Sequence, residues 1–156
     1  MIQLYYGFGK GKTTAAIGAG MRAFGAGMSV LLIQFLKDCN SSEISAVPFE
    51  IFKAPEKLPF NPEKKAYQPW VESALDYAAE SNCQIIILDE LLDIIQTEEE
   101  TNRIINILKN KPDTEFIITG HKRLDALFEI ADYITCFTKE KHPYDKGVKA
   151  RKGIEY

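Results

Sequence analysis

The sequence has few cysteines and no long hydrophobic run. Its apolar stretches fall short of the roughly 20 residues that span a bilayer, so we expect no membrane association. Met1 leads straight into a strand-like segment, without the basic start and apolar stretch of a secretory signal, and we expect a cytoplasmic protein. Cys39, Cys83 and Cys136 are odd in number and widely spaced, which indicates neither a disulfide framework nor a zinc site.

An excess of charge of one sign is also missing. The 156 residues carry 19 Lys and Arg against 22 Asp and Glu, a net charge of -3, which argues against nucleic acid as the main partner. Lys146, Lys149, Arg151 and Lys152 make the tail basic, but too few aromatic side chains alternate with them for a single-strand binding surface. The length predicts a single domain, 1–156.

The sequence does contain a glycine-rich segment directly after the apolar run Ile2–Tyr6. It reads Gly7-Phe8-Gly9-Lys10-Gly11-Lys12-Thr13-Thr14. A strand that ends in such a turn and opens into a helix leaves several backbone N–H groups aimed at one point, where the helix dipole adds positive potential. We therefore predict a polyphosphate site, with the Lys12 ammonium between phosphates and the Thr13 hydroxyl on Mg²⁺ or Mn²⁺. The general loop pattern has a glycine where this chain has Tyr6, so the turn is wound differently.

Six apolar, β-branched or aromatic runs are strand candidates. They are Ile2–Tyr6, Ser29–Phe35, Phe49–Phe52, Gln84–Leu88, Glu115–Thr119 and Tyr133–Phe137. Continuous apolar runs such as Ile85 to Leu88 indicate strands buried on both faces, as in a parallel sheet with helices on either side. With the phosphate loop, these runs predict an α/β P-loop NTPase (RecA-like) three-layer fold with a mostly parallel central sheet of about six strands.

Four helices are expected between the strands. They span Thr13–Ala26, Lys64–Ser81, Thr97–Asn110 and Arg123–Ile130. The first is rich in Ala and Gly and can pack close to the sheet. Trp70 falls on the apolar stripe of the second, where we interpret it as a core residue. Thr97 and Glu100 form a capping box for the third, whose acidic first turn offsets the helix dipole.

The buried run that ends at Leu88 is followed by Asp89 and Glu90, at the sheet edge where ligands of open α/β sheets bind. Because the phosphate loop is present, we interpret them as metal-binding partners of Thr13. Successive strand residues point to opposite sides, so one carboxylate is expected to face the metal and the other to lie behind it or cap the next helix. The sequence leaves open which one does which.

Two stretches, 37–46 and 54–62, fit no regular element, and loops of this length are usually functional. The tail 139–156 is either a flexible end or an ordered lid. His121 follows a strand end near the expected site, where we interpret it as a structural hydrogen-bonding residue. The spacing shows no protein nucleophile with a paired base and no arginine finger.

Over nearly its whole length the chain resembles the P-loop type of cob(I)alamin (corrinoid) adenosyltransferase. The matching segments are Gly7–Ala16, Arg22–Gly27, Gln34–Lys37, Leu88–Leu91, Ala131-Asp132, Lys141–Tyr144, Gly147–Ala150 and Gly153–Tyr156. The resemblance implies that the Co(I) ion of a reduced corrinoid attacks the ribose 5′ carbon of ATP. Triphosphate then leaves, and adenosylcobalamin or an adenosylated precursor forms, while the protein supplies orientation and charge stabilisation.

The resemblance also implies roles for single residues. Lys12, Thr13 and Glu90 are implied as catalytic, and Thr13, Asp89 and Glu90 as ligands of Mg²⁺. The implied ATP contacts are Gly7, Gly9, Lys10, Gly11, Lys12, Thr13 and Thr14. The candidate corrinoid or lid contacts are Phe60, His142 and Lys149. A homodimer, a closing tail 139–156 and an electron-donating reductase partner are implied as well.

Three positions depart from the family pattern. Leu58-Pro59-Phe60 stands where members carry an aromatic pair ending in tryptophan, Gly120-His121 replaces Gly-Arg, and Asp38 replaces glycine. These changes bear on corrinoid affinity rather than on the phosphate site. A conventional P-loop ATPase or kinase and a non-catalytic, nucleotide-dependent corrinoid-binding protein are the alternatives.

Overall fold

The computed structural model describes residues 1–37, 41–54 and 64–154. Within these ranges six strands form one sheet in the order β3-β2-β4-β5-β1-β6, and every neighbouring pair is parallel. The strands are β1 (Ile2–Tyr6), β2 (Val30–Gln34), β3 (Glu50–Phe52), β4 (Ile85–Asp89), β5 (Glu115–Gly120) and β6 (Tyr133–Cys136). The expected α/β P-loop NTPase (RecA-like) fold is confirmed, with a sheet that is wholly rather than mostly parallel.

The helices connect these strands. They are α1 (Lys12–Gly25), α2 (Lys64–Glu80), α3 (Leu91–Ile94), α4 (Glu98–Lys109) and α5 (Asp125–Phe128), with the 3-10 turns η1 (Ser42–Ser45) and η2 (Pro143–Lys146). The first three predicted helices begin and end within one residue of α1, α2 and α4, whereas α5 is shorter than the expected 123–130. Helix α3 and the two turns were not predicted, because four residues are too few to show a helical period. None of the described helices is long and apolar enough to cross a membrane.

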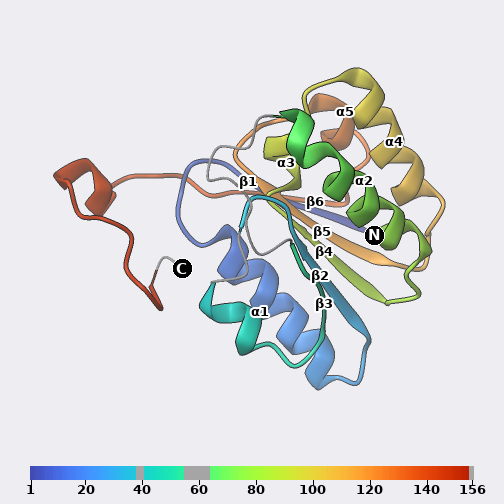
Figure 1. The fold of residues 1–156 in the computed structure, drawn as a ribbon, viewed down its shortest axis with the longest axis horizontal. Coiled ribbons are helices and arrows are strands. Elements are labelled where there is room, and N and C mark those ends of the chain that lie inside the picture. Colours follow the sequence, from blue (N-terminus) through green and yellow to red (C-terminus); the bar gives the residue numbers. More distant parts are fainter. Residues whose placement is uncertain (38–40, 55–63, 155–156) are drawn as a thin grey trace.

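The fold has three layers, which Figure 1 shows with α1 on one face of the sheet and α2, α4 and α5 on the other. Alternate strand residues serve the two faces. Leu32 and Ile87 pack with Ala16 of α1, whereas Ile33 and Ile86 belong to the cluster under α2 and α4. Since successive side chains point to opposite faces, a strand covered on both sides is apolar throughout.

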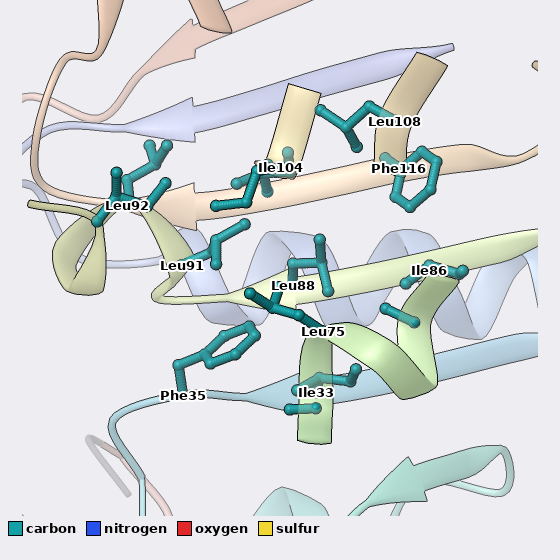
Figure 2. Packing of buried hydrophobic residues seen from close by; sticks show 14 of the residues in the cluster. Ile33, Phe35, Leu75, Ile86, Leu88, Leu91, Leu92, Ile104, Leu108 and Phe116 are labelled. Carbon is teal, nitrogen blue, oxygen red and sulfur yellow. The ribbon is translucent and has the colours of Figure 1, made fainter. Parts of the chain in front are cut away.

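The larger core lies between the sheet and the helices α2 and α4. Figure 2 shows Leu75 and Ile104 of these two helices in one cluster with Ile33, Leu88 and Phe116 of the sheet. Trp70 is half-buried beside this core and packs edge-on against Phe35 at 5.5 Å between ring centres.

Helix α4 begins at the capping box that the sequence predicts. The Thr97 hydroxyl accepts a hydrogen bond from Glu100 N (3.2 Å), and the Glu100 carboxylate accepts one from Thr97 N (2.9 Å). Three glutamates occupy the first turn, as expected for residues that offset the helix dipole.

Helix α1 lies close to the sheet because its inner face carries small residues. Ala16 and Gly20 are buried, and a Cβ atom on Gly20 would lie 2.8 Å from Ile87 Cδ1. The expected close packing is therefore present. It fixes the N-terminal end of α1, where the glycine-rich loop enters the helix.

The tail leaves the body of the fold after β6, and Figure 1 shows it projecting away from the sheet. Its contacts include an ion pair between Lys139 and Asp145 (2.9 Å) and a hydrogen bond from Val148 N to Pro143 O (3.2 Å). These bonds fold the tail upon itself at η2.

Candidate functional site

A cleft of about 470 Å³ lies where the glycine-rich loop meets the carboxyl ends of β4 and β5. Its lining comes from the loop, the start of α1, the segment after β2, the ends of β4 and β5, and the tail. The lining residues are Phe8, Gly9, Lys10, Gly11, Lys12, Thr13, Thr14, Ile17, Lys37, Ser42, Glu43, Glu90, His121, His142, Gly153 and Ile154. The structure thus brings together most of the residues that the sequence singled out.

The glycine-rich loop is anchored to the segment that follows β6. Gly9 N donates a hydrogen bond to Phe137 O (2.6 Å). A Cβ atom on Gly9 would lie 2.7 Å from the Phe137 carbonyl carbon, so this close approach requires glycine. Tyr6, which stands where the general pattern has a glycine, is the last residue of β1 and stacks edge-on against Phe128. The turn therefore begins at Gly7, one residue later than in the general pattern.

Lys12 lies beneath this loop. Its Nζ donates hydrogen bonds to Gly7 O (2.7 Å) and Gly9 O (3.0 Å), which holds the ammonium inside the turn. Burial lowers the pKa of Lys12, while the nearby carboxylates, Asp93 first, act in the opposite direction. The Lys12 ammonium is bonded to backbone carbonyls and lines a cleft, so it can replace these hydrogen bonds with bonds to phosphate oxygens.

Asp89 is fully buried and surrounded by donors. Thr13 Oγ1 lies 2.9 Å from Oδ1, Thr119 Oγ1 donates to the same oxygen (2.7 Å), and Gln34 Nε2 donates to Oδ2 (3.1 Å). Lys37 Nζ adds an ion pair at 3.6 Å. The carboxylate that touches Thr13 is therefore that of Asp89.

Glu90 follows with a different environment. Its backbone is left-handed (φ 64°), it caps α3, and its N–H donates to Thr119 Oγ1 (2.9 Å). Its Oε2 is buried without a hydrogen-bond partner among the described residues. Burial, together with the charge of Asp89, raises the pKa of Glu90 to about 7. Glu90 thus lies at the cap of the next helix and in the cleft lining, whereas Asp89 contacts Thr13.

A second ion pair, which the sequence did not predict, borders the cleft. Lys37 Nζ donates to Glu43 Oε1 (2.9 Å), and Gln34 Nε2 bonds the same oxygen (3.1 Å). Burial opposes the charge of Lys37, but the carboxylates of Asp89 and Glu43 outweigh it, and its pKa is raised. The pKa of Glu43 is lowered, because Lys37 outweighs the effect of burial. The signal in the sequence was the irregular stretch 37–46, whose length predicted a functional loop.

The remaining predicted contacts lie in different places. His142 borders the cleft, and its Nδ1 accepts a hydrogen bond from Tyr144 N (3.2 Å) at the start of η2. Lys149 is exposed on the tail and is not among the residues that line the cleft. Phe60 and its neighbours Leu58 and Pro59 fall outside the described residues, as do Asp38 and Cys39.

A divalent cation fits the oxygen atoms at the centre of this site. Within the described ranges, no three His, Cys, Asp or Glu side chains form a cluster able to hold a metal ion by themselves. The Thr13 hydroxyl, the buried Asp89 carboxylate that it contacts, and Glu90 Oε2, which has no hydrogen-bond partner among the described residues, are nonetheless hard oxygen donors. Thr13 and Glu90 line the cleft beside the glycine-rich loop. Mg²⁺ commonly takes one or two protein oxygens and completes its shell with phosphate and water. The residues therefore fit a metal that arrives with a polyphosphate.

Comparison with known proteins gives one consistent result. The family described as ATP:corrinoid adenosyltransferase BtuR/CobO/CobP matches residues 1–156. A corrinoid adenosyltransferase of Escherichia coli is 31% identical over 172 residues, which cover 100% of this chain and 85% of that protein. The corrinoid adenosyltransferase CobA of Salmonella typhimurium is 30% identical over 173 residues, with the same coverage.

Among solved structures, AMPPCP-bound DnaA from Aquifex aeolicus aligns with a TM-score of 0.49 and 12% identity. The alignment covers 97% of this chain and 47% of that chain.

Proposed function

This chain belongs to the ATP:corrinoid adenosyltransferase family and is a transferase, and on that premise we propose that it moves the 5′-deoxyadenosyl group of ATP to a reduced corrinoid. The Co(I) ion of the corrinoid substrate supplies two electrons to the ribose 5′ carbon. The bond between that carbon and the α-phosphate oxygen breaks, and triphosphate leaves with the bonding pair. The observation that carries this proposal is that Lys12 and Thr13 line one cleft. Lys12 bonds the glycine-rich loop there, and Thr13 contacts Asp89.

In this proposal the protein stabilises the leaving group. The backbone N–H groups of the loop, the N-terminal end of α1 and the Lys12 ammonium face the site where negative charge grows on triphosphate. Gly7, Gly9, Lys10, Gly11 and Thr14 would complete the ATP contacts. No side chain is needed as a nucleophile, since the corrinoid substrate provides it.

Thr13, Asp89 and Glu90 would hold the Mg²⁺ or Mn²⁺. A bound divalent cation would neutralise charge on the phosphate oxygens. Thr13 and Asp89 already lie within hydrogen-bond distance of each other, and the buried donors Thr119 and Gln34 fix the direction of the Asp89 carboxylate. Glu90 adds an oxygen in the cleft lining that has no protein partner among the described residues.

We propose that residues 1–156 act as a single domain whose tail, 139–156, closes over the cleft. His142, Gly153 and Ile154 border the cleft although the tail projects from the body, which supports such a closure. The corrinoid would lie between this tail and the segment 37–62. Phe60 and Lys149 remain candidates for its contacts. A cytoplasmic homodimer supplied with electrons by a reductase is part of the same proposal.

Product identity tests the proposed reaction. The protein is incubated without oxygen with ATP, Mg²⁺ and chemically reduced cobalamin, and the expected products are a light-sensitive alkylcobalamin spectrum and one triphosphate per adenosyl group. Release of ADP would identify a conventional ATPase or kinase instead. Binding of ATP and corrinoid without either product would identify a non-catalytic corrinoid-binding protein.

The Lys12→Ala variant should lose turnover by at least a hundredfold, because removal of a preorganised charge from the leaving-group site typically costs this much. The fold should persist, since the hydrogen bonds of Lys12 within the described part of the chain go to loop carbonyls and its side chain is half-buried. Lys109→Ala, at the exposed end of α4, is the matched control and should retain full activity. Retained activity in Lys12→Ala would show that the loop does not bind the triphosphate.

A further inference from the structure

His121 is held in one orientation beside the phosphate loop. The carboxylate of Asp93 accepts a hydrogen bond from His121 N (2.9 and 3.1 Å to its two oxygens) and lies 2.8 Å from His121 Nδ1. A carboxylate oxygen is an acceptor, so Nδ1 carries the proton in this pair. Nε2 is left for a ligand, and it has no hydrogen-bond partner within the described residues.

The other side of the imidazole is packed by the loop itself. The ring of Phe8 lies 5.4 Å from that of His121, and the Phe8 side chain is otherwise largely exposed. Gly120 allows α3 to come this close, because a Cβ atom there would lie 2.6 Å from Leu92 Cβ and 3.2 Å from an Asp93 oxygen. His121 is therefore positioned by both α3 and the loop.

The sheet order places His121 between the metal-binding residues and the loop. Strand β5 lies between β4, which ends at Asp89, and β1, which enters the loop. His121 follows β5 and lines the same cleft as Lys12 and Thr13. The neighbouring cation, Lys122, instead donates to the backbone oxygens of Asp93 (3.0 Å) and Ile95 (3.3 Å). His121, rather than Lys122, therefore lines the cleft directly after β5.

We propose that His121 is a phosphate-contacting residue, which donates a hydrogen bond from Nε2 to bound triphosphate when its imidazole is doubly protonated. This inference rests on the proposed function, since it takes the polyanion to be the triphosphate of ATP. A neutral imidazole with its proton on Nδ1 offers only a lone pair at Nε2, which a phosphate oxygen repels. The charged groups around the ring are Asp93 on α3, Lys122 beside it, and Lys12 and Glu90 in the cleft.

Affinity for ATP and Mg²⁺ without corrinoid tests this assignment, measured by calorimetry at pH 6. His121→Arg keeps a donor and a fixed charge, whereas His121→Gln removes the charge. His121→Arg should bind ATP at least as tightly as wild type, because a charge-assisted hydrogen bond to the phosphate is kept. His121→Gln should bind ATP about tenfold more weakly than wild type, the size of one charge-assisted hydrogen bond.

Equal affinities of wild type and His121→Gln at pH 6 would overturn the assignment. So would a variant that loses affinity for corrinoid alone, because His121 would then face the other substrate. In both cases product formation by the wild-type protein still decides the proposed function independently. A wild-type protein that binds no ATP would refute both.

Discussion

At the scale of single residues, Asp89 and Glu90 are neighbours with opposite surroundings. Asp89 is fully buried, yet three hydrogen-bond donors and Lys37 surround it, whereas Glu90 has a buried oxygen without a partner in the described part of the chain. Burial without compensation disfavours the charged form of Glu90 and raises its pKa. The Asp89 carboxylate is therefore held by hydrogen bonds and an ion pair, whereas the buried oxygen of Glu90 has no such partner among the described residues.

Glu90 should make the metal-free protein less stable as the pH rises. Its pKa is raised from 4.5 to about 7 in the folded state, so the folded state holds this proton more tightly than the unfolded chain. The stabilisation is complete below pH 4.5 and is lost as the pH rises through 7. Glu90→Gln, which cannot ionise, should lie within about 1 kcal/mol of wild type at pH 5 and be more stable by up to about 3 kcal/mol at pH 8.5.

Urea unfolding in the presence of a chelator measures this difference. Glu140→Gln, at an exposed position of the tail, is the control and should follow wild type at both pH values. A Glu90→Gln variant that gains equally at pH 5 and pH 8.5 would show that the gain comes from packing rather than from the charge.

Thr119 forms hydrogen bonds with both Asp89 and Glu90, and we expect its hydroxyl to contribute more to the free energy of unfolding than the volume of its side chain does. Its Oγ1 donates to Asp89 (2.7 Å) and accepts from Glu90 N (2.9 Å) at a fully buried position. Thr119→Val keeps the volume but leaves both partners unsatisfied, so we expect a loss of about 1–3 kcal/mol in the free energy of unfolding. Thr114→Val, whose hydroxyl makes one long bond of 3.5 Å, should cost less. Equal losses in the two variants would contradict this role.

At the scale of elements, Gly18 and Gly20 of α1 have different surroundings. Gly18 is exposed, and a Cβ atom there would meet nothing within 4 Å, whereas at Gly20 it would lie 2.8 Å from Ile87 Cδ1. Gly18→Ala should stabilise the protein by about 0.5–1 kcal/mol, because alanine loses less backbone freedom in a helix. Gly20→Ala should gain less or lose stability, since the helix cannot move away from the sheet without shifting the loop. Thermal unfolding compares the two, and equal gains would argue against tight packing of α1.

At the scale of the whole molecule, nucleotide binding should depend on a divalent cation. Lys12 faces the carboxylates of Asp93, Glu90 and Asp89, so a polyphosphate that enters alone meets negative charge beside the loop. At a hundredfold excess over Kd, ATP with Mg²⁺ should stabilise the folded state by about 2.7 kcal/mol. For a domain of this size that raises Tm by roughly 5–10 °C.

Thermal unfolding with ATP in Mg²⁺ and in a chelator measures the metal dependence. The shift should shrink markedly in the chelator and should be absent in Lys12→Ala. An equal shift with and without the cation would remove the assigned metal role of Thr13 and Asp89.

Features that depend on neighbouring residues can be predicted from the sequence. The strands, three of the helices, the Thr97 capping box and the glycine-rich turn are encoded by local pattern, and their predicted bounds hold to within one or two residues. It also placed Asp89 and Glu90 at a sheet edge, because a buried strand must end there. It missed α3, which is too short to leave a periodic signal.

How these local elements meet is visible in the tertiary structure alone. It separated the roles of Asp89 and Glu90, paired Lys37 with Glu43, and set Asp93 against His121 across 28 positions of sequence. The pair of Asp93 and His121 depends on the order of strands in the sheet, which brings the ends of β4 and β5 side by side at one edge. A linear pattern carries no information on which distant carboxylate reaches which cation, because that choice depends on distances fixed only when both faces of the sheet are packed.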